Sequence, residues 1–252
     1  MSKSLIAWLV AWIINVVGTV LPALATDICE GSSKTEDVCI CKLSELHPTQ
    51  ASVGMMEVRI RMEKLKKEIE RRSEQDFLSF MRKHNRIEPI VIGPGGAFYI
   101  TDRHHLARAL YDLGEATTYC KVLDNLSGLQ PDAFWKHMED SNGVYLKDHQ
   151  GNVITPRDLP TSLRELRNDP FRSLAGAVRE SCGFGSDNKD VPDGNYLEFK
   201  WADYLRARWA QTSIEVDEID AHFDRTTQAA LQLATQKEAA GLPGYTGKTS
   251  CQ

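Results

Sequence analysis

The sequence predicts an α+β fold, in which a small mixed sheet with helices is followed by an α-helical C-terminal half. Two observations carry this prediction. Apolar runs of strand length flank a helical pattern between residues 89 and 123, whereas apolar residues recur at helical spacing through most of residues 127–252. The second pattern continues for more than a hundred residues, so the helices outweigh the sheet.

The best-defined stretch is a strand, turn, strand, helix, strand unit. Pro89–Ile92 and Phe98–Ile100 have strand composition and are joined by the turn sequence at 93–96, which contains three glycines and a proline. Asp102 is a suitable N-cap for the helix that follows, and 117–123 returns as a strand. Such a unit packs as a small α/β layer.

Helices are predicted on both sides of this unit. Between Gly54 and His84 the apolar spacing fits one long helix or two helices broken near Ser73. Pro131 occupies a first-turn position of a later helix, and further helices are expected at 197–209 and 216–240. Leu43–Leu46 fits either a short strand or a turn. No strand is predicted in Thr26–Lys42, which is polar and without clear periodicity.

The first residues predict a secretory signal peptide. Lys3 precedes the apolar stretch 5–20, and Ala23–Ala25 forms an A-x-A cleavage site, so the mature chain starts at Thr26 and is secreted or periplasmic, with no stable membrane span. An uncleaved membrane anchor is the alternative, because the apolar run is near spanning length. The expected organisation is a signal peptide at 1–25, a cysteine-bearing N-terminal segment at 26–42, an α/β domain at 43–126 and a helical region at 127–252 packed on it.

All six cysteines follow the predicted signal, which places them in an oxidising compartment where disulfides are expected. Sequence alone does not choose among the pairings, although Cys29 with Cys39 or Cys41 would close a small N-terminal loop. A zinc site is the alternative for this cluster. Its C-x9-C-x-C spacing lacks the C-x2-C pairs typical of zinc sites.

The net charge restricts the class of partner. A formal charge of −5 disfavours a dedicated DNA-coating surface, because such a surface concentrates Lys and Arg against the phosphates. A local basic groove stays compatible with this total. Nucleic acid therefore remains a candidate ligand only for such a groove.

Four polar residues cluster where the predicted strand ending at Ile100 turns into a helix: Asp102, Arg103, His104 and His105. Unpaired N–H groups and the helix dipole favour anions there, Arg103 can hold a phosphate by forked hydrogen bonds, and a histidine can exchange a proton. Adjacent helical residues diverge by about 100°, so only one histidine is expected to face the site. The alternatives are capping and structural roles, or a metal that lacks an obvious third ligand.

Two further groups are weaker candidates. Glu57 lies on the first turn of the helix after Gly54, where with Arg61 it fits equally a surface ion pair. Arg172 and Ser173 lie in the opening turn of a helix started by Asp169, where they could clamp a second anionic group. Simple helix capping is the alternative for this second group.

Several blocks in order carry a resemblance to a known family. The blocks are Leu46–Gly54, Ile90–Gly96, Asp102–Leu110, Asp169–Ala175, Glu198–Asp203 and Leu242–Tyr245. On these residues the chain resembles the ParB-like nuclease family of the ParB/sulfiredoxin-like superfamily. The resemblance implies a ParB/sulfiredoxin-like mixed sheet and covers most of the mature chain.

The superfamily includes chromosome-partitioning ParB domains, sulfiredoxin and a free-serine kinase, in which the matching strand-to-helix motif binds nucleotide phosphates. By that similarity, Arg103, His104 and His105 would contact phosphate. The chain lacks the G-E-R-R of partitioning proteins and the G-C-H-R of sulfiredoxin. The resemblance therefore does not extend to their CTP-switch or reductase roles.

The sequence thus predicts an exported protein that binds a phosphate-containing ligand, either a small molecule or nucleic acid, and hydrolyses phosphoester bonds. His104 or His105 would act as general acid or base, and Glu57 would orient or activate water. The residues assigned to phosphate are Asp102, Arg103, Arg172 and Ser173. A divalent metal stays open as a cofactor. The alternatives are a nucleotide-dependent phosphotransferase and a non-catalytic module that binds a ligand or a protein partner.

Overall fold

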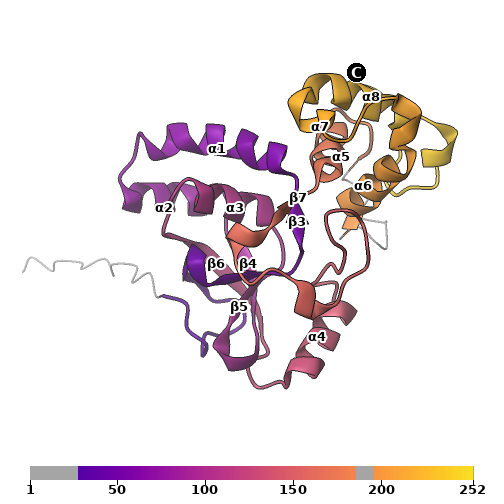
Figure 1. The fold of residues 1–252 in the computed structure, drawn as a ribbon. Coiled ribbons are helices and arrows are strands. Elements are labelled where there is room, and N and C mark those ends of the chain that lie inside the picture. The colour runs from indigo at the N-terminus through magenta and orange to yellow at the C-terminus, as the bar shows by residue number, and fades with distance from the viewer. Residues whose placement is uncertain (1–27, 186–195, 252) are drawn as a thin grey trace, which may run out of the picture.

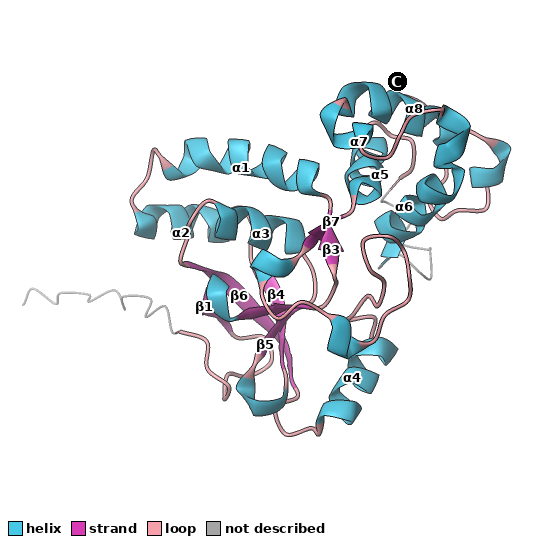
Figure 2. Ribbon diagram, viewed as in Figure 1, coloured by secondary structure: helices cyan, strands magenta, loops and turns pink. Residues whose placement is uncertain are grey.

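The computed structural model describes residues 28–185 and 196–251, and a mixed five-stranded sheet forms its centre (Figures 1 and 2). The strands follow the order β1-β6-β4-β5-β2, with β1 antiparallel to β6, β6 parallel to β4, β4 antiparallel to β5 and β5 parallel to β2. Their bounds are β1 Val38–Lys42, β2 Leu46–Pro48, β4 Glu88–Ile92, β5 Phe98–Ile100 and β6 Thr117–Asn125. The predicted α+β class is confirmed.

Helices cover the sheet and then form a group of their own. Figure 1 shows α1, α2 and α3 side by side over the sheet, and α5 to α8 gathered beyond a short parallel pair, β3–β7. The helices are α1 Met55–Ile69, α2 Glu74–Lys83, α3 His104–Asp112, α4 Pro131–Asp140, α5 Pro170–Glu180, α6 Leu197–Arg208, α7 Glu218–Ala221 and α8 Phe223–Ala234. The short pair consists of β3 Ser52–Val53 and β7 Arg167–Asn168.

Alternating side chains of β4 contribute to two separate cores, one shared with α1, α2 and α3 and one shared with α4. Ile90 and Ile92 are buried in the core shared with α1, α2 and α3, whereas Val91 belongs to a second cluster with Phe134 of α4. Successive side chains of a strand point to opposite faces, so one strand supplies both cores. The apolar run therefore reads as a strand buried on both faces.

The C-terminal helices have their own core. Trp201 of α6 is fully buried, stacks on Phe184 at a centroid distance of 4.6 Å, and donates its indole N–H to the Pro243 carbonyl over 2.9 Å. The same cluster joins residues of α5, α6, α7 and α8. The helical half expected from the sequence is thus a packed unit whose aromatic residues are mainly structural.

Three local predictions can be compared with the observed elements. The break near Ser73 is confirmed, since its hydroxyl accepts the Asp76 N–H and starts α2. The single helix expected at 216–240 is wrong, because His222 leaves helical geometry between α7 and α8. Strand β1 was not predicted: it contains Cys39 and Cys41, buried against the sheet core, within the segment expected to have no strand.

Three disulfides are present, as the position of the cysteines predicts. They join Cys29 to Cys39, Cys41 to Cys120, and Cys182 to Cys251. The expectation that Cys29 closes a small N-terminal loop is therefore confirmed, with Cys39 as its partner.

The predicted signal peptide at 1–25 lies outside the described residues. Within the described part of the chain, every helix is too short or too polar to cross a bilayer.

Candidate functional site

The turn from β5 into α3 has an unusual backbone. Arg103, rather than Asp102, is the N-cap residue, with φ 62° and ψ 24°, so the prediction of Asp102 as N-cap is wrong. The Asp102 carboxylate instead accepts the Arg103 N–H over 2.6 Å. No side chain caps α3, and Arg103 donates a guanidinium N–H to the Asn85 carbonyl. The left-handed conformation is strained for a residue with a β-carbon, and such strain is often found at functional sites.

Both histidines at the start of α3 are buried and attach the helix to the segment between β2 and α1. Nε2 of His104 accepts the Thr49 N–H over 3.1 Å, and Nε2 of His105 accepts the Gly54 N–H over 2.9 Å. Both also line a cleft, so the expectation that only one histidine faces the site is wrong. The reason is that the 49–54 segment curves past the helix start and offers an N–H group to each ring.

Burial keeps both rings neutral at physiological pH. It lowers the pKa of His104 to about 3, with the nearby His105 and Arg172 acting in the same direction. It lowers the pKa of His105 to about 4, because burial and Arg172 outweigh the carboxylate of Glu57. Neutral rings agree with the acceptor role of each Nε2 atom.

Glu57 reaches the site from the first turn of α1. Its Oε2 lies 3.5 Å from Nε2 of His105 and has no hydrogen-bond partner, while Oε1 accepts the Nε–H of Arg61 over 3.0 Å. Burial alone would raise the pKa of Glu57, but His105 and Arg61 outweigh it, so the pKa is lowered and the group is a carboxylate. A β-carbon at Gly176 would lie 3.1 Å from Oε2, so the bare backbone of α5 provides the space for this oxygen.

Arg172 is the most unusual group of the site. It lies on α5, which Asp169 caps by accepting the Phe171 N–H, and its side chain is 5% exposed. The guanidinium carbon lies 3.4 Å from the ring centroid of Phe199, and Nη2 lies 3.7 Å from a carboxylate oxygen of Glu198. Nε and Nη1 have no hydrogen-bond partner. Burial lowers the pKa of Arg172, against the opposing effect of Glu198.

Ser173 has a different position from the one predicted. It does not line the cleft; its hydroxyl accepts the Met56 N–H over 3.2 Å and thereby caps α1 from a neighbouring helix. A β-carbon at Gly54 would lie 2.5 Å from the Ser173 amide nitrogen, so α1 and α5 meet closely here. Figure 1 shows this approach beside the β3–β7 pair.

Except for Ser173, these groups border one cleft of about 890 Å³, which is lined by residues of α1, α3, α5 and α6 and of the loop after α4. Three aromatic residues form one wall of the cleft: the rings of Tyr145 and Phe199 are 3.8 Å apart, and the ring of Tyr196 lies 5.3 Å from that of Tyr145. The cationic lining residues are Arg61, Lys64, Arg86, Arg103, Arg172 and Arg179, and the acidic ones are Glu57, Asp102, Asp124 and Glu198. Lys64, Arg86, Tyr145 and Tyr196 were not predicted as site residues, since no motif or spacing marks them.

A metal site requires several ligand side chains that converge on one point. Among residues 28–185 and 196–251, the potential ligand side chains that converge in threes are Cys29, Cys41 and Cys120, which lie outside the cleft and belong to disulfides. The carboxylates and histidines of the cleft do not form such a group.

One comparison with known proteins identifies a family, and a second finds a similar solved structure. The family model described as "Putative ParB-like nuclease" matches residues 39–207, which is more than half of the chain. The structure is similar to that of protein Atu1540 from Agrobacterium tumefaciens, with 33% sequence identity and a TM-score of 0.69, covering 84% of this chain and 99% of that one. A search of curated proteins gave no match.

Proposed function

Because this chain belongs to the ParB-like nuclease family, we propose that its cleft binds a phosphate-containing ligand and hydrolyses a phosphoester bond. The observation that carries the proposal is the guanidinium of Arg172, which is buried in the cleft lining with Nε and Nη1 unpaired. A family name does not establish a reaction, whereas the chemistry of the site supports one.

A buried guanidinium without full hydrogen bonding is costly. Leaving a buried charged donor unpaired costs at least about 1–3 kcal/mol, and an arriving anion would recover this cost. Phe199 and Glu198 hold Arg172 in place, so its orientation does not have to be fixed when a ligand binds. A phosphate oxygen is the natural acceptor for such a group.

The start of α3 supplies the second part of the anion site. Its first-turn N–H groups have no side-chain cap, and Arg103 stands at the cleft edge beside them. Helix N-termini favour phosphate through these donors and through the helix dipole. In the proposed complex, Arg172 and the start of α3 bind the phosphate from two sides.

Glu57 and His105 are the proposed acid–base groups. Glu57 is ionised and offers an oxygen without a hydrogen-bond partner, so it can accept a proton from a water molecule that attacks phosphorus. As the P–O ester bond breaks, the leaving oxygen takes a proton from Glu57 or from solvent. His105, whose Nε2 lies 3.5 Å from Glu57, could take up a proton there only by releasing the Gly54 N–H. His104, whose Nε2 accepts the Thr49 N–H, instead positions α3 against the 49–54 segment.

Ligand binding without turnover is the second candidate function. It is favoured by the hydrogen bonds that occupy Nε2 of both histidines, because a ring nitrogen held by a backbone N–H is less available for proton transfer. Either function is compatible with the aromatic wall.

Export is part of the same proposal. Three disulfides are compatible with an oxidising compartment, and the predicted cleavage site lies before Thr26. Expression of the full chain in a bacterium with a periplasm, followed by N-terminal sequencing, should give a chain that starts at Thr26. An uncut chain retained in the membrane would contradict this.

The decisive experiment compares binding and turnover in matched variants. Binding of inorganic phosphate and of a dinucleotide is measured by calorimetry for wild type, Arg172→Gln and Glu57→Gln. Turnover of the same three proteins is measured as hydrolysis of bis(p-nitrophenyl) phosphate, with and without added Mg²⁺. Arg225→Gln is the control, since Arg225 is exposed and lies 3.8 Å from Glu218, outside the cleft. Arg172→Gln should abolish binding, and Glu57→Gln should abolish turnover alone. Binding that survives in Arg172→Gln would refute the site, and binding without turnover in wild type would support the second candidate.

A further inference from the structure

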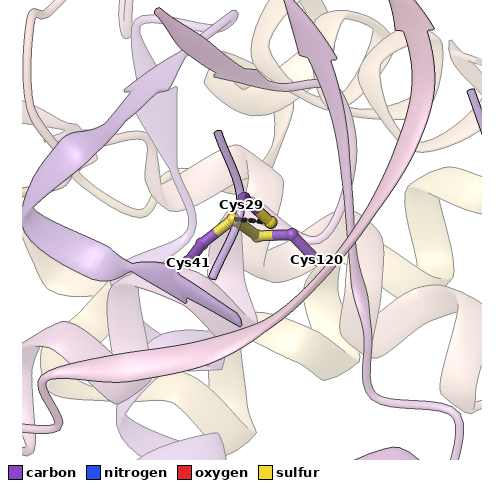
Figure 3. Close-up of side chains that lie close together, drawn as sticks. All are labelled: Cys29, Cys41 and Cys120. Atoms are coloured by element: carbon purple, nitrogen blue, oxygen red, sulfur yellow. Dashed lines mark hydrogen bonds between the residues drawn. A yellow bond between two sulfur atoms is a disulfide. The ribbon is translucent and has the colours of Figure 1, made fainter. Parts of the chain in front are cut away.

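Four of the six cysteines gather in one buried cluster at the edge of the sheet. Cys29 and Cys39 form one disulfide and Cys41 and Cys120 a second, and each residue is at most 6% exposed. Figure 3 shows Cys29 directly beside the sulfur atoms of Cys41 and Cys120. The Sγ atoms of Cys29 and Cys41 are 3.2 Å apart, and the three Sγ atoms all lie within 4.8 Å of one another. The two disulfides are therefore in direct contact.

A second pairing of the same four cysteines is within reach. Cys39 of β1 and Cys120 of β6 are register partners in the antiparallel pair. The Cα atoms of such partners lie about 4.5–5.5 Å apart, within the range of roughly 4.4–6.8 Å that a disulfide spans. Cys29 and Cys41 already touch. Bonds Cys39–Cys120 and Cys29–Cys41 could thus replace the present pair without a change of strand register.

We propose that these four residues form a thiol–disulfide exchange site whose reagent is a thiol. The thiolate of the reagent attacks Sγ of Cys39, the Cys29–Cys39 bond breaks, and Cys29 leaves as a thiolate. Cys29 then attacks Sγ of Cys41, and Cys120 leaves with the electron pair of the broken bond. Cys120 attacks Cys39 and releases the reagent thiolate. Two disulfides exist before and after, so no oxidant or reductant is consumed.

The fold makes Cys29–Cys39 the entry point. Ile28, next to Cys29, is 64% exposed, and the segment before β1 is held to it by a bridge from Ile28 to Ile40 and a 2.9 Å bond from the Cys29 N–H to the Ile40 carbonyl. The Asn125 side chain also donates to the Gly31 and Ser33 carbonyls, and Val122 exchanges hydrogen bonds with Glu36 and Asp37, so a thiol reaches Cys39 when this segment opens locally. Cys41 and Cys120 are 1% and 0% exposed. The inner disulfide is reached through Cys29.

The variant Cys39→Ser tests the transfer directly, because it leaves one thiol that starts on Cys29 in the full chain. The purified variant is unfolded in guanidinium at mildly acidic pH, where exchange is slow, and its free thiol is labelled with N-ethylmaleimide. Cys29 and Cys120 fall on different tryptic peptides, so mass spectrometry identifies the labelled residue. Label on Cys120, alone or with Cys29, is expected. Label confined to Cys29 would overturn the proposal.

A second variant covers the case in which Cys39→Ser fails to fold. Cys29→Ser combined with Cys41→Ser leaves Cys39 and Cys120, which should form a disulfide and give no free thiol from this pair. Two free thiols there would overturn the alternative pairing. Cys182→Ser is the matched control, since its single thiol should stay on Cys251. Label spread from Cys251 to the sheet cysteines would mean general scrambling and would also overturn the site.

Discussion

Replacing Ser173 with alanine separates helix capping from phosphate binding. The Ser173 hydroxyl accepts the Met56 N–H over 3.2 Å, and Gly54, the N-cap residue of α1, has no side chain to replace it. Ser173→Ala leaves this amide in the first turn of α1 without its acceptor. Loss of a cap of this kind costs about 1 kcal/mol in the free energy of unfolding. In a chain of this size the melting temperature should fall by about 2–4 °C.

Urea unfolding followed by tryptophan fluorescence, with the disulfides intact, measures the loss. Ser79→Ala is the control, since the exposed Ser79 hydroxyl donates to the Gln75 carbonyl of its own helix. Its effect should stay within about 0.5 kcal/mol. Affinity for inorganic phosphate should be unchanged in Ser173→Ala, because Ser173 does not line the cleft. Unchanged stability with about tenfold weaker phosphate binding, equal to roughly 1.4 kcal/mol, would refute this reasoning.

Two further predictions concern pH. Burial raises the pKa of Glu88 well above its ordinary 4.5, so the folded chain keeps a proton that the unfolded chain releases, and stability is lost as pH rises from 4.5 toward the folded pKa. Glu88→Gln should therefore raise the urea midpoint relative to wild type more at pH 8 than at pH 4, and an equal effect at both would contradict this. The ring resonances of His104 and His105 should stay those of neutral imidazole from pH 8 to about pH 5, since burial lowers their pKa values to about 3 and 4. The unfolded chain binds these protons from about pH 6.5 downward, so both rings destabilise the fold as pH falls. A ring that titrates near 6.5 in nuclear magnetic resonance would contradict the prediction.

Local signals predicted many elements correctly. The break before α2 follows from Ser73, which satisfies an N–H three residues on, and the start of α5 follows from Asp169 and the proline after it. Strand β1 escaped prediction for a related reason. Its sequence VCICK has four apolar residues in a row, so the alternation of buried and exposed positions in the structure leaves no polar signal in the sequence.

The site was predicted only in part. Their adjacent positions in the sequence marked Asp102 to His105 as a cluster. The N–H groups that His104 and His105 accept belong to Thr49 and Gly54, which precede them by 55 and 51 positions. Glu57 meets His105 because α1 and α3 pack together, and Arg172 meets Phe199 because α5 and α6 do. The spacing of residues along one helix does not predict contacts with residues of another helix.

The sequence by itself determined the order of most elements, the caps of α2 and α5, the mixed fold class and the presence of disulfides, because these depend on interactions over a few residues or on composition. Tertiary structure alone decided which side chains line the cleft, that both histidines are neutral, and that Ser173 caps α1 instead of facing a ligand. The physical reason is burial. Desolvation and hydrogen bonding depend on which distant segments exclude water from a group, and that is fixed only when the layers pack.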